Sequence, residues 1–281
     1  MKDEEILKNK KGRKKQQFSE VKNTICQMLC KDASLTQSQI SAELNRSEVS
    51  RSQSGISRIL KDMGYTRKRL VKVPEERNNP KNITSRQCYA REMQFIADGN
   101  LVFLDETGTN LHQSRNYGYS PKNMKAIRIV KGGRGKNISS MVAIKNTGIL
   151  AYDIREGSFD GDCFITFIQE KLKVHFQNNP TDVLIMDNCP FHHRKDVIAL
   201  LKKENINHRF LPPYSPQLNP IEEYFSHFKA VLSSIRPFTK NKEELISRIR
   251  HTLEEETINF NGFFVNMRRY VEKALARHDF I

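Results

Sequence analysis

The chain has 281 residues, with 47 lysines and arginines against 32 aspartates and glutamates, and a formal net charge of +15 at neutral pH. A positive surplus of this size favours a polyanionic partner, most often nucleic acid. A membrane is less favoured, because the sequence has neither an apolar run of spanning length nor a basic amphipathic helix with an aromatic face. The five cysteines form no C-x-x-C pair and indicate neither a disulfide framework nor a zinc site, so we expect an intracellular protein of one large domain or two unequal ones.

Residues 1–17 are predicted to form a disordered basic arm. Its run KNKKGRKK includes Arg13 and Lys14, which are candidates for contacts with DNA. The same run also fits a nuclear-import signal or a solvated tail. We expect the protein in the nucleus if its host is eukaryotic, and otherwise in the cytoplasm or nucleoid.

Three short helices are predicted over residues 18–65. Each has an apolar stripe at helical spacing, and the second and third begin with capping boxes, Thr36 with Gln39 and Ser50 with Gln53. Three such helices with a short turn before the third are typical of a helix-turn-helix DNA-binding domain, although a plain three-helix bundle is the alternative. The outward face of the third helix carries side chains suited to base edges and phosphates, namely Arg51, Ser54, Ser57, Arg58 and Lys61.

A basic linker is predicted over residues 66–99, because it opens with TRKRLVKVPEERNNPKN, which is basic and then rich in proline and asparagine. Arg67, Lys68 and Arg69 are expected to contact the backbone of DNA, which supplies the sequence-independent part of affinity.

From about residue 100 the pattern becomes that of an α/β domain. The runs LVFL (101–104) and VLIM (183–186) are short and fully apolar, as buried central strands are. SSMVAI and ILAYDI flank a turn at 146–148 and predict a hairpin, and NHRFL predicts a further strand. Helices are expected near 160–175 and 192–204.

Three acidic residues carry the functional hypothesis. Asp105 and Asp187 follow the two buried runs, and Glu222 lies in the first turn of a helix that Asn219 as cap and Pro220 predict to begin there. Singly, each aspartate fits a turn residue, and Glu222 fits a capping box with Asn219. If the strands are neighbours, the three acids meet, and such a cluster stays ionised only with cations among the carboxylates, for which Mg²⁺ or Mn²⁺ is suited. Two such ions about 3.5–4 Å apart are the recurrent means of in-line displacement at phosphorus.

The spacing of these acids resembles a known pattern. LDET contains the first aspartate, DNCPFH opens with the second, and 34 residues (222 − 187 − 1) separate the second from the glutamate of LNPIE. These motifs resemble those of the DDE/D transposases of the Tc/mariner superfamily and their bacterial insertion-sequence relatives, over about residues 18–235. The resemblance implies an α/β, RNase H-like catalytic domain over 100–235, with a mixed sheet flanked by helices. An all-α helix-turn-helix domain over 18–65 precedes it, and a C-terminal helical region over 236–281 follows.

The resemblance also implies roles for individual residues. Asp105, Asp187 and Glu222 map onto the catalytic, metal-binding triad, which would hold Mg²⁺ or Mn²⁺ as two ions. Asn188 and His192 would support the site without binding metal, and the adjacent Glu223 would be a surface residue. The implied protein is a DNA transposase that binds the terminal inverted repeats of its element, cuts there, and joins the freed 3′-hydroxyl to a TA target, as a homodimer or larger assembly.

The chain departs from the family pattern at two places. It has no tryptophan, and Phe225 stands where many relatives have one. Relatives commonly carry two helix-turn-helix units joined by a Gly-Arg-rich hook. The segment 12–14 resembles that hook without a helical pattern before it, so we expect the first unit to be missing. Two other functions are considered, a domesticated or inactive copy that only binds DNA and another RNase H-like nuclease or integrase. The three intact acids count against the first, and the lack of a Cys/His zinc module counts against the second.

Overall fold

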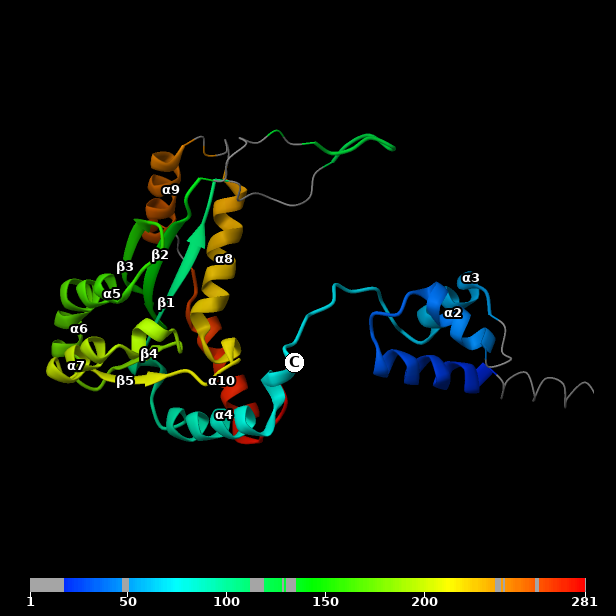
Figure 1. Cartoon of the computed structure of the whole chain (residues 1–281), viewed down its shortest axis with the longest axis horizontal. Helices are drawn as coiled ribbons and strands as arrows, with labels where there is room; N and C mark the ends of the chain where they lie inside the picture. The colour runs from blue at the N-terminus through cyan, green and yellow to red at the C-terminus, as the bar shows by residue number, and fades with distance from the viewer. Residues whose placement is uncertain are drawn as a thin grey trace, which may run out of the picture. The chain divides into compact units, whose positions relative to one another are not determined.

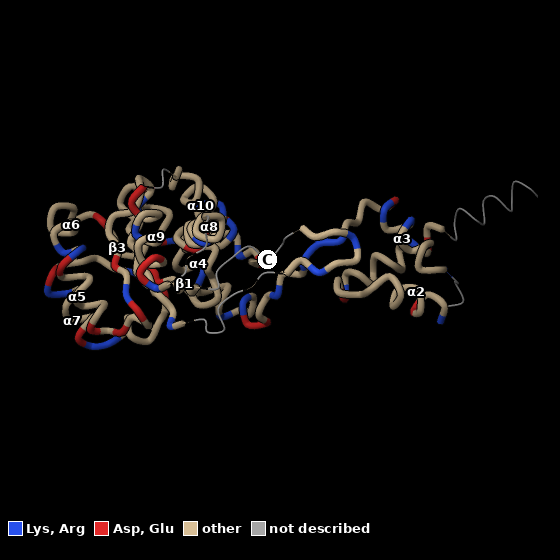
Figure 2. The backbone as a smooth tube through the Cα atoms, turned by 90° about the horizontal axis from the view of Figure 1, so that it is seen from above, with Lys and Arg blue, Asp and Glu red and all other residues tan. Residues whose placement is uncertain are grey.

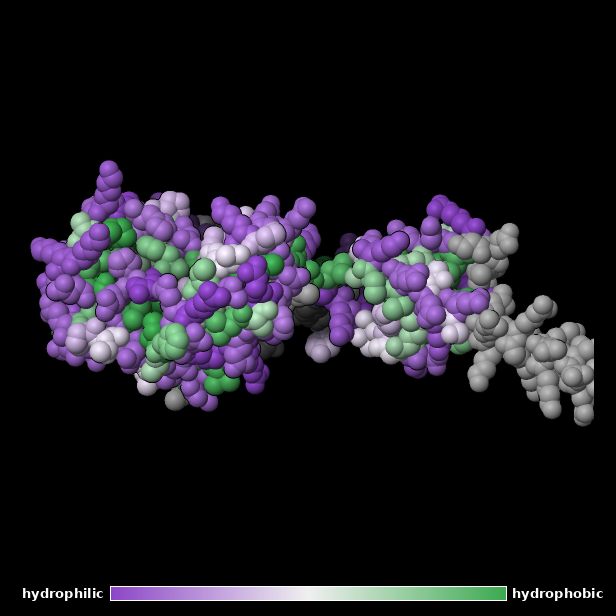
Figure 3. All heavy atoms as spheres, turned by 90° about the horizontal axis from the view of Figure 1, so that it is seen from below, coloured by the Kyte–Doolittle hydropathy of each residue, from purple (hydrophilic) through white to green (hydrophobic). Residues whose placement is uncertain are grey.

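A computed structural model describes residues 18–46, 51–111, 119–127, 129, 135–235, 239, 241–255 and 258–280. The chain divides into two compact units, Met1–Lys72 and Val73–Ile281 (Figure 1). The predicted basic arm, with Arg13 and Lys14, lies outside the described residues. Among the described helices, none has the length and apolar character needed to cross a membrane. Polar side chains cover most of the face shown in Figure 3.

The described part of the first unit forms three helices, at residues 18–31, α2 (Gln37–Arg46) and α3 (Gln53–Asp62), which confirms the predicted pattern. The capping box before α2 is also confirmed, because the Thr36 amide donates to Gln39 Oε1 at 2.8 Å and the Gln39 amide donates to Thr36 Oγ1 at 3.3 Å. The cap predicted at Ser50 is wrong, since Ser52 caps α3 by accepting from the Gly55 amide, and Ser50 itself lies outside the described residues. The predicted apolar stripes meet in one small core, formed by Val21, Ile25, Ile40, Leu44, Ile56 and Ile59.

The described part of the second unit contains a five-stranded sheet in the order β3-β2-β1-β4-β5. The strands β1, β4 and β5 run parallel, whereas β1 pairs antiparallel with β2 and β2 with β3, so the mixed sheet is as expected. The predicted hairpin is the β2–β3 pair. The strands span Leu101–Thr109 (β1), Ile138–Lys145 (β2), Gly148–Glu156 (β3), Val183–Met186 (β4) and Asn207–Phe210 (β5).

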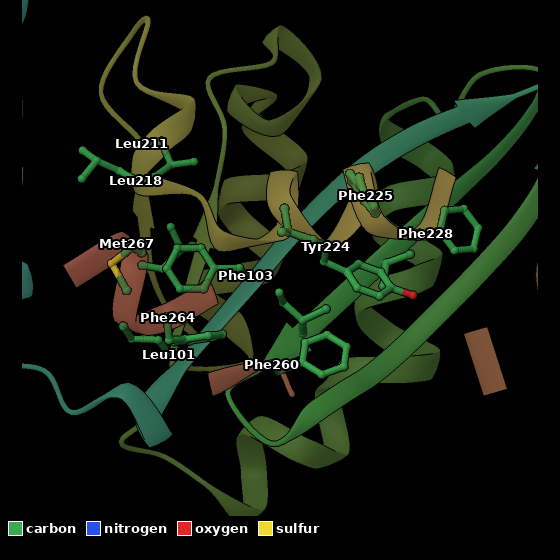
Figure 4. Close-up of a cluster of buried hydrophobic side chains, with 14 of the residues drawn as sticks. Leu101, Phe103, Leu211, Leu218, Tyr224, Phe225, Phe228, Phe260, Phe264 and Met267 are labelled. Atoms are coloured by element: carbon green, nitrogen blue, oxygen red, sulfur yellow. The ribbon is translucent and has the colours of Figure 1, made fainter. Parts of the chain in front are cut away.

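Helices cover both faces of this sheet, because the apolar runs of its central strands are buried on both sides. One face packs against α4 (Pro80–Met93), α8 (Pro220–Ser234), α9 (Lys242–Glu255) and α10 (Asn261–Leu275), and Figure 4 shows part of that core. The other face packs against α5 (Gly161–Phe167), a π-helical segment (Ile168–Leu172), α6 (Lys173–Asn178) and α7 (Lys195–Lys203). Short 3₁₀ turns lie at Glu75–Asn78, Asp98–Asn100, Pro190–His193 and Pro216–Leu218.

The linker predicted over residues 66–99 is wrong from Val73 onwards, because that part belongs to the second unit and includes α4. The sequence NNPKN suggested a loop, whereas Asn79-Pro80 is a helix start whose Asn79 side chain accepts from the Asn82 amide at 2.8 Å. The end of α4 is tied to α10, since Arg268 donates to the Met93 carbonyl at 2.6 Å and to Asp98 Oδ1 at 2.6 Å. The predicted C-terminal region is helical, and its helices share the core of the sheet.

Candidate active site

The two candidate aspartates lie side by side, Asp105 on β1 and Asp187 directly after the neighbouring strand β4. The strands β1 and β4 pair in parallel with Phe103 opposite Ile185, so the same register sets Asp105 opposite Asp187 two residues later. The condition set by the sequence, that the two strands are neighbours, is therefore met. The expectation that the first strand ends at Asp105 is wrong, because β1 continues to Thr109 and pairs Asp105 with Val142 of β2.

Side-chain alternation directs both aspartates to the sheet face that α8 covers. Leu101 and Phe103 belong to the core cluster on that face, and Asp105 follows at the strand period of two. The helix α8 is fixed against this cluster by an apolar stripe of four buried residues, Ile221, Tyr224, Phe225 and Phe228. Glu222 is thus carried to the aspartates by a rigid helix, while its own side chain stays open to solvent.

The electrostatics of Asp105 link the three acids. Burial raises the pKa of Asp105 to about 8, with further repulsion from Glu106, Glu222 and Asp187, against a hydrogen bond from the Glu106 amide. Partial desolvation raises the pKa of Glu222 as well, where attraction by Lys229 opposes repulsion by Asp187. The three predicted carboxylates therefore lie within one another's electric field.

The neighbouring Glu223 faces elsewhere. Its Oε1 accepts a hydrogen bond from Asn266 of α10, and its side chain is half-buried. The expectation of a plain surface residue is wrong, because Glu223 joins α8 to α10. The two adjacent glutamates point about 100° apart on the helix, and of the two it is Glu222 that adds to the repulsion raising the pKa of Asp105.

His192 contacts Asp187 and fixes its carboxylate. The imidazole is completely buried, with Nδ1 at 2.9 Å from Asp187 Oδ1 and Nε2 at 3.6 Å from Glu106 Oε1. Burial acts to lower the pKa of His192, but the hydrogen bond to Asp187 and the negative charges of Asp187 and Glu106 outweigh burial and raise the pKa to about 9. Burial likewise acts to raise the pKa of Asp187, and the hydrogen bonds from His192 and the Cys189 amide outweigh it and lower that pKa. A charged imidazole therefore keeps Asp187 ionised and orients it.

Asn188 supports the backbone beside the site. Its side-chain amide donates to the Leu211 carbonyl, and its Oδ1 accepts from His193 Nε2 at 3.2 Å. Asn188 thus joins the turn after β4 to the segment that leads from β5 towards α8.

The chemistry of this donor set suits a divalent cation. Carboxylates are the preferred ligands of Mg²⁺ and Mn²⁺, and a cation among them would relieve the repulsion that raises the pKa of Asp105. His192 and the Cys189 amide both donate to Asp187 Oδ1, whereas Oδ2 has no hydrogen-bond partner among the described residues and is the oxygen left for an ion. In the part of the chain that the structure describes, no three acidic, histidine or cysteine side chains form a ready-made cage for an ion.

Comparison with known proteins identifies the family. Residues 100–246, more than half of the 281-residue chain, match the family model described as DDE superfamily endonuclease. The chain belongs to the DDE superfamily endonucleases. No curated protein matches it by sequence.

Solved structures give the fold of this DDE superfamily endonuclease. The Mos1 strand transfer complex matches with a TM-score of 0.74 and 19% identity, covering 92% of this chain and 78% of that one. The Mos1 transposase paired-end complex with the left transposon end matches with a TM-score of 0.73 and 20% identity, covering 91% and 77%. The catalytic domain of Mos1 mariner transposase matches with a TM-score of 0.53 and 13% identity, covering 76% and 100%. The second unit is thus the expected RNase H-like fold.

Among the described residues of the first unit, the candidate DNA-binding residues are exposed with one exception. Ser54, Ser57, Arg58 and Lys61 are exposed on α3, whose basic residues Figure 2 marks, whereas Arg51 is half-buried before α3. Arg67, Lys68 and Arg69 are exposed in the extended segment that follows. Their role in this endonuclease stays a prediction.

Sequence reasoning missed two residues of the site. Glu106 faces His192, and the only signal was its place beside Asp105 in LDET. Asn219 was expected to cap α8, but it makes no side-chain cap bond, and its Nδ2 donates to Asp105 Oδ2 at 2.9 Å. The capping box predicted between Asn219 and Glu222 is therefore wrong.

Proposed function

We propose that this endonuclease is a DNA transposase, which binds the terminal inverted repeats of its element and carries out strand cleavage and strand transfer with divalent metal. The observation that carries the proposal is that Asp105 on β1, Asp187 directly after the parallel strand β4 and Glu222 on the helix that packs over them lie within one another's electric field. Structures of similar fold have been solved as complexes with a transposon end and as a strand transfer complex, and this likeness supports the proposal.

Asp105, Asp187 and Glu222 are the proposed catalytic and metal-binding residues. When bound, divalent cations supply the positive charge that neutralises the phosphodiester and activates water. His192 keeps Asp187 ionised and fixed, and the apolar stripe of α8 holds the backbone of Glu222 at a constant position. The chain's own contribution is therefore the placement of three carboxylates, and no covalent enzyme intermediate is needed.

Finer parts of the proposal concern the ions and the DNA. We propose two ions of Mg²⁺ or Mn²⁺, since Mos1 complexes of similar fold were solved with each of these metals. The proposed target is a TA dinucleotide, and the proposed active form is a homodimer or larger assembly on double-stranded DNA. The net charge of +15 supports a DNA partner.

A cleavage assay tests the proposal. A linear DNA that carries the inverted repeat flanking the gene is incubated with the protein and Mg²⁺ or Mn²⁺. Wild type is expected to cut at the element's end only with metal, and Asp105→Asn and Asp187→Asn are expected to lose cutting by at least 100-fold while repeat binding persists. Cutting at the wild-type rate by either variant would remove that aspartate from the site.

A further inference from the structure

Two of the described helices begin with the same dipeptide, Asn-Pro, and the two asparagines behave differently. Asn79 precedes α4 and caps it, because its side chain accepts a hydrogen bond from the Asn82 amide at 2.8 Å. Asn219 precedes α8 and makes no side-chain cap bond. Its backbone also differs, with φ −113° and ψ 98° against −66° and 155° for Asn79. The local sequence predicts a cap at both positions, so a tertiary contact must turn Asn219 away.

That contact is with the first candidate aspartate. Asn219 Nδ2 donates to Asp105 Oδ2 at 2.9 Å, and only 3% of the Asn219 residue is exposed. Asn219 Oδ1 is also buried and has no hydrogen-bond partner within the described part of the chain. The Asn219 side chain therefore makes no cap bond, and its own oxygen is buried without a hydrogen bond. Both features are unfavourable, so we attribute the direction of the side chain to its hydrogen bond with Asp105.

The backbone of Asn219 connects the same contact to Glu222. The Glu222 amide donates to the Asn219 carbonyl at 3.2 Å, and the Asn219 amide donates to the Pro216 carbonyl at 3.0 Å. Leu218, just before Asn219, is completely buried in the core that α8 shares with the sheet. The backbone on both sides of Asn219 is thus fixed. Through Asn219, the strand that carries Asp105 is connected to the first turn of the helix that carries Glu222.

We infer that Asn219 is a positioning residue, which fixes Asp105 and Glu222 relative to each other so that both can hold the same cations. The inference rests on the proposed function, since it assigns these carboxylates to metal. Asn219 acts through Asp105 by its Nδ2–H donor and is not itself a metal ligand. Unlike Asn79, Asn219 does not cap the helix that follows it.

Serine and alanine substitutions separate the two roles. Serine is as good a helix cap as asparagine, but its hydroxyl lies one bond nearer the backbone and cannot span the distance to Asp105. Alanine at this position has neither a donor for Asp105 nor a group that could cap α8. The same pair of substitutions at Asn79 provides the matched control, because Asn79 caps α4 outside the site.

The test measures Mn²⁺ affinity by titration of the full-length protein, with thermal unfolding in EDTA and DNA cleavage alongside. Asn219→Ser and Asn219→Ala are both expected to weaken Mn²⁺ binding by about 10- to 100-fold, as loss of an outer-shell partner does. Asn219→Ser should unfold no earlier than wild type in EDTA. Asn79→Ser and Asn79→Ala should leave Mn²⁺ affinity within about twofold, and only Asn79→Ala should lower the unfolding temperature.

A double substitution tests whether the effect passes through Asp105. In an Asp105→Asn background, Asn219→Ser should weaken the residual Mn²⁺ affinity by less than about twofold, because the acceptor of its hydrogen bond has changed. Wild-type Mn²⁺ affinity in Asn219→Ser, or an undiminished effect in the Asp105→Asn background, would overturn the inference and leave Asn219 as an ordinary buried polar residue. Wild-type protein that neither binds Mn²⁺ nor cuts DNA would instead contradict the proposed function.

Discussion

Asp105 shows how burial and charge act on one carboxyl group of the site. In the folded protein its pKa lies at about 8 instead of the ordinary 3.8, first because of burial and then because of repulsion from Glu106, Glu222 and Asp187. The folded state therefore binds more protons than the unfolded state between these two pH values. The contribution of this group to the free energy of unfolding falls as pH rises from about 4 to about 8, and a bound cation reverses that loss.

This fall with rising pH gives a prediction for the stability of the protein without metal. In EDTA, the unfolding temperature of wild type should fall between pH 5 and pH 8 more steeply than that of Asp105→Asn, whose side chain cannot ionise. Adding Mn²⁺ at pH 8 should raise the unfolding temperature of wild type and have a smaller effect on the variant. Differential scanning calorimetry measures both quantities. Parallel curves for the two proteins would mean that Asp105 titrates normally.

His192 gives a second prediction for single residues. Because Nδ1 is the atom that contacts Asp187, His192→Asn keeps a donor near that position, whereas His192→Leu fills the space without a donor. We expect cleavage to fall about 10- to 100-fold in His192→Leu and by less in His192→Asn. Single-turnover cleavage rates measure the difference, and circular dichroism checks that both variants fold. Equal rates in the two variants would argue against a hydrogen-bonding role.

At the scale of the elements, the local sequence pattern predicted the strands that the hydrophobic core determines. It failed at the cap of α8 and at the helix α4. The runs LVFL and VLIM are central strands because their residues are buried on both faces. The cap at Asn219 failed because a contact with Asp105, distant in sequence, overrides a local preference of about 0.5–2 kcal/mol. The helix α4 was not predicted, because its segment is charged and contains proline. Its apolar face, formed by Tyr89, Ala90 and Met93, becomes evident only from its packing against the core that includes α10.

The C-terminal helix α10 gives a prediction at this scale, since it lies beyond residue 246, where the family match ends. Phe264 of α10 is completely buried against Phe103 of β1, with ring centroids 5.5 Å apart. Phe264→Ala should lower the free energy of unfolding by about 3–5 kcal/mol. The adjacent Val265 is 46% exposed, so Val265→Ala should change it by less than about 1 kcal/mol. Urea unfolding compares the two, and equal losses would show that α10 is not part of the core.

At the scale of the whole molecule, the sequence could indicate the acids but not how the fold joins them. Asp105, Asp187 and Glu222 lie far apart in the chain, and the parallel pairing of β1 with β4 and the packing of α8 bring them together. The motif spacing predicted the outcome only through resemblance to a family. The contacts of His192, Glu106 and Asn219 could not be predicted, because they depend on side-chain directions that no periodicity encodes.

The division into two units predicts separable DNA binding. Residues 1–72 have their own small core, so a fragment of this length should fold and bind duplex DNA, with affinity falling steeply as salt rises. Arg58→Ala, on the exposed face of α3, should weaken binding to the repeat more than to unrelated DNA, whereas Arg69→Ala should weaken both alike. Fluorescence anisotropy at several salt concentrations measures these affinities. A fragment with no affinity at low salt would place DNA binding elsewhere.

The central claim is that Asp105, Asp187 and one particular glutamate form a metal-dependent cleavage site. Glu222 and Glu223 are adjacent in the chain, yet it is Glu222 that repels the aspartates, while Glu223 accepts a hydrogen bond from Asn266. The most direct measurement is therefore the rate of Mg²⁺-dependent cleavage at the element's end by Glu222→Gln and Glu223→Gln, each compared with wild type. Glu222→Gln should abolish cleavage, and Glu223→Gln should stay within a few-fold of wild type. Loss of cleavage in Glu223→Gln with Glu222→Gln still active would contradict the account.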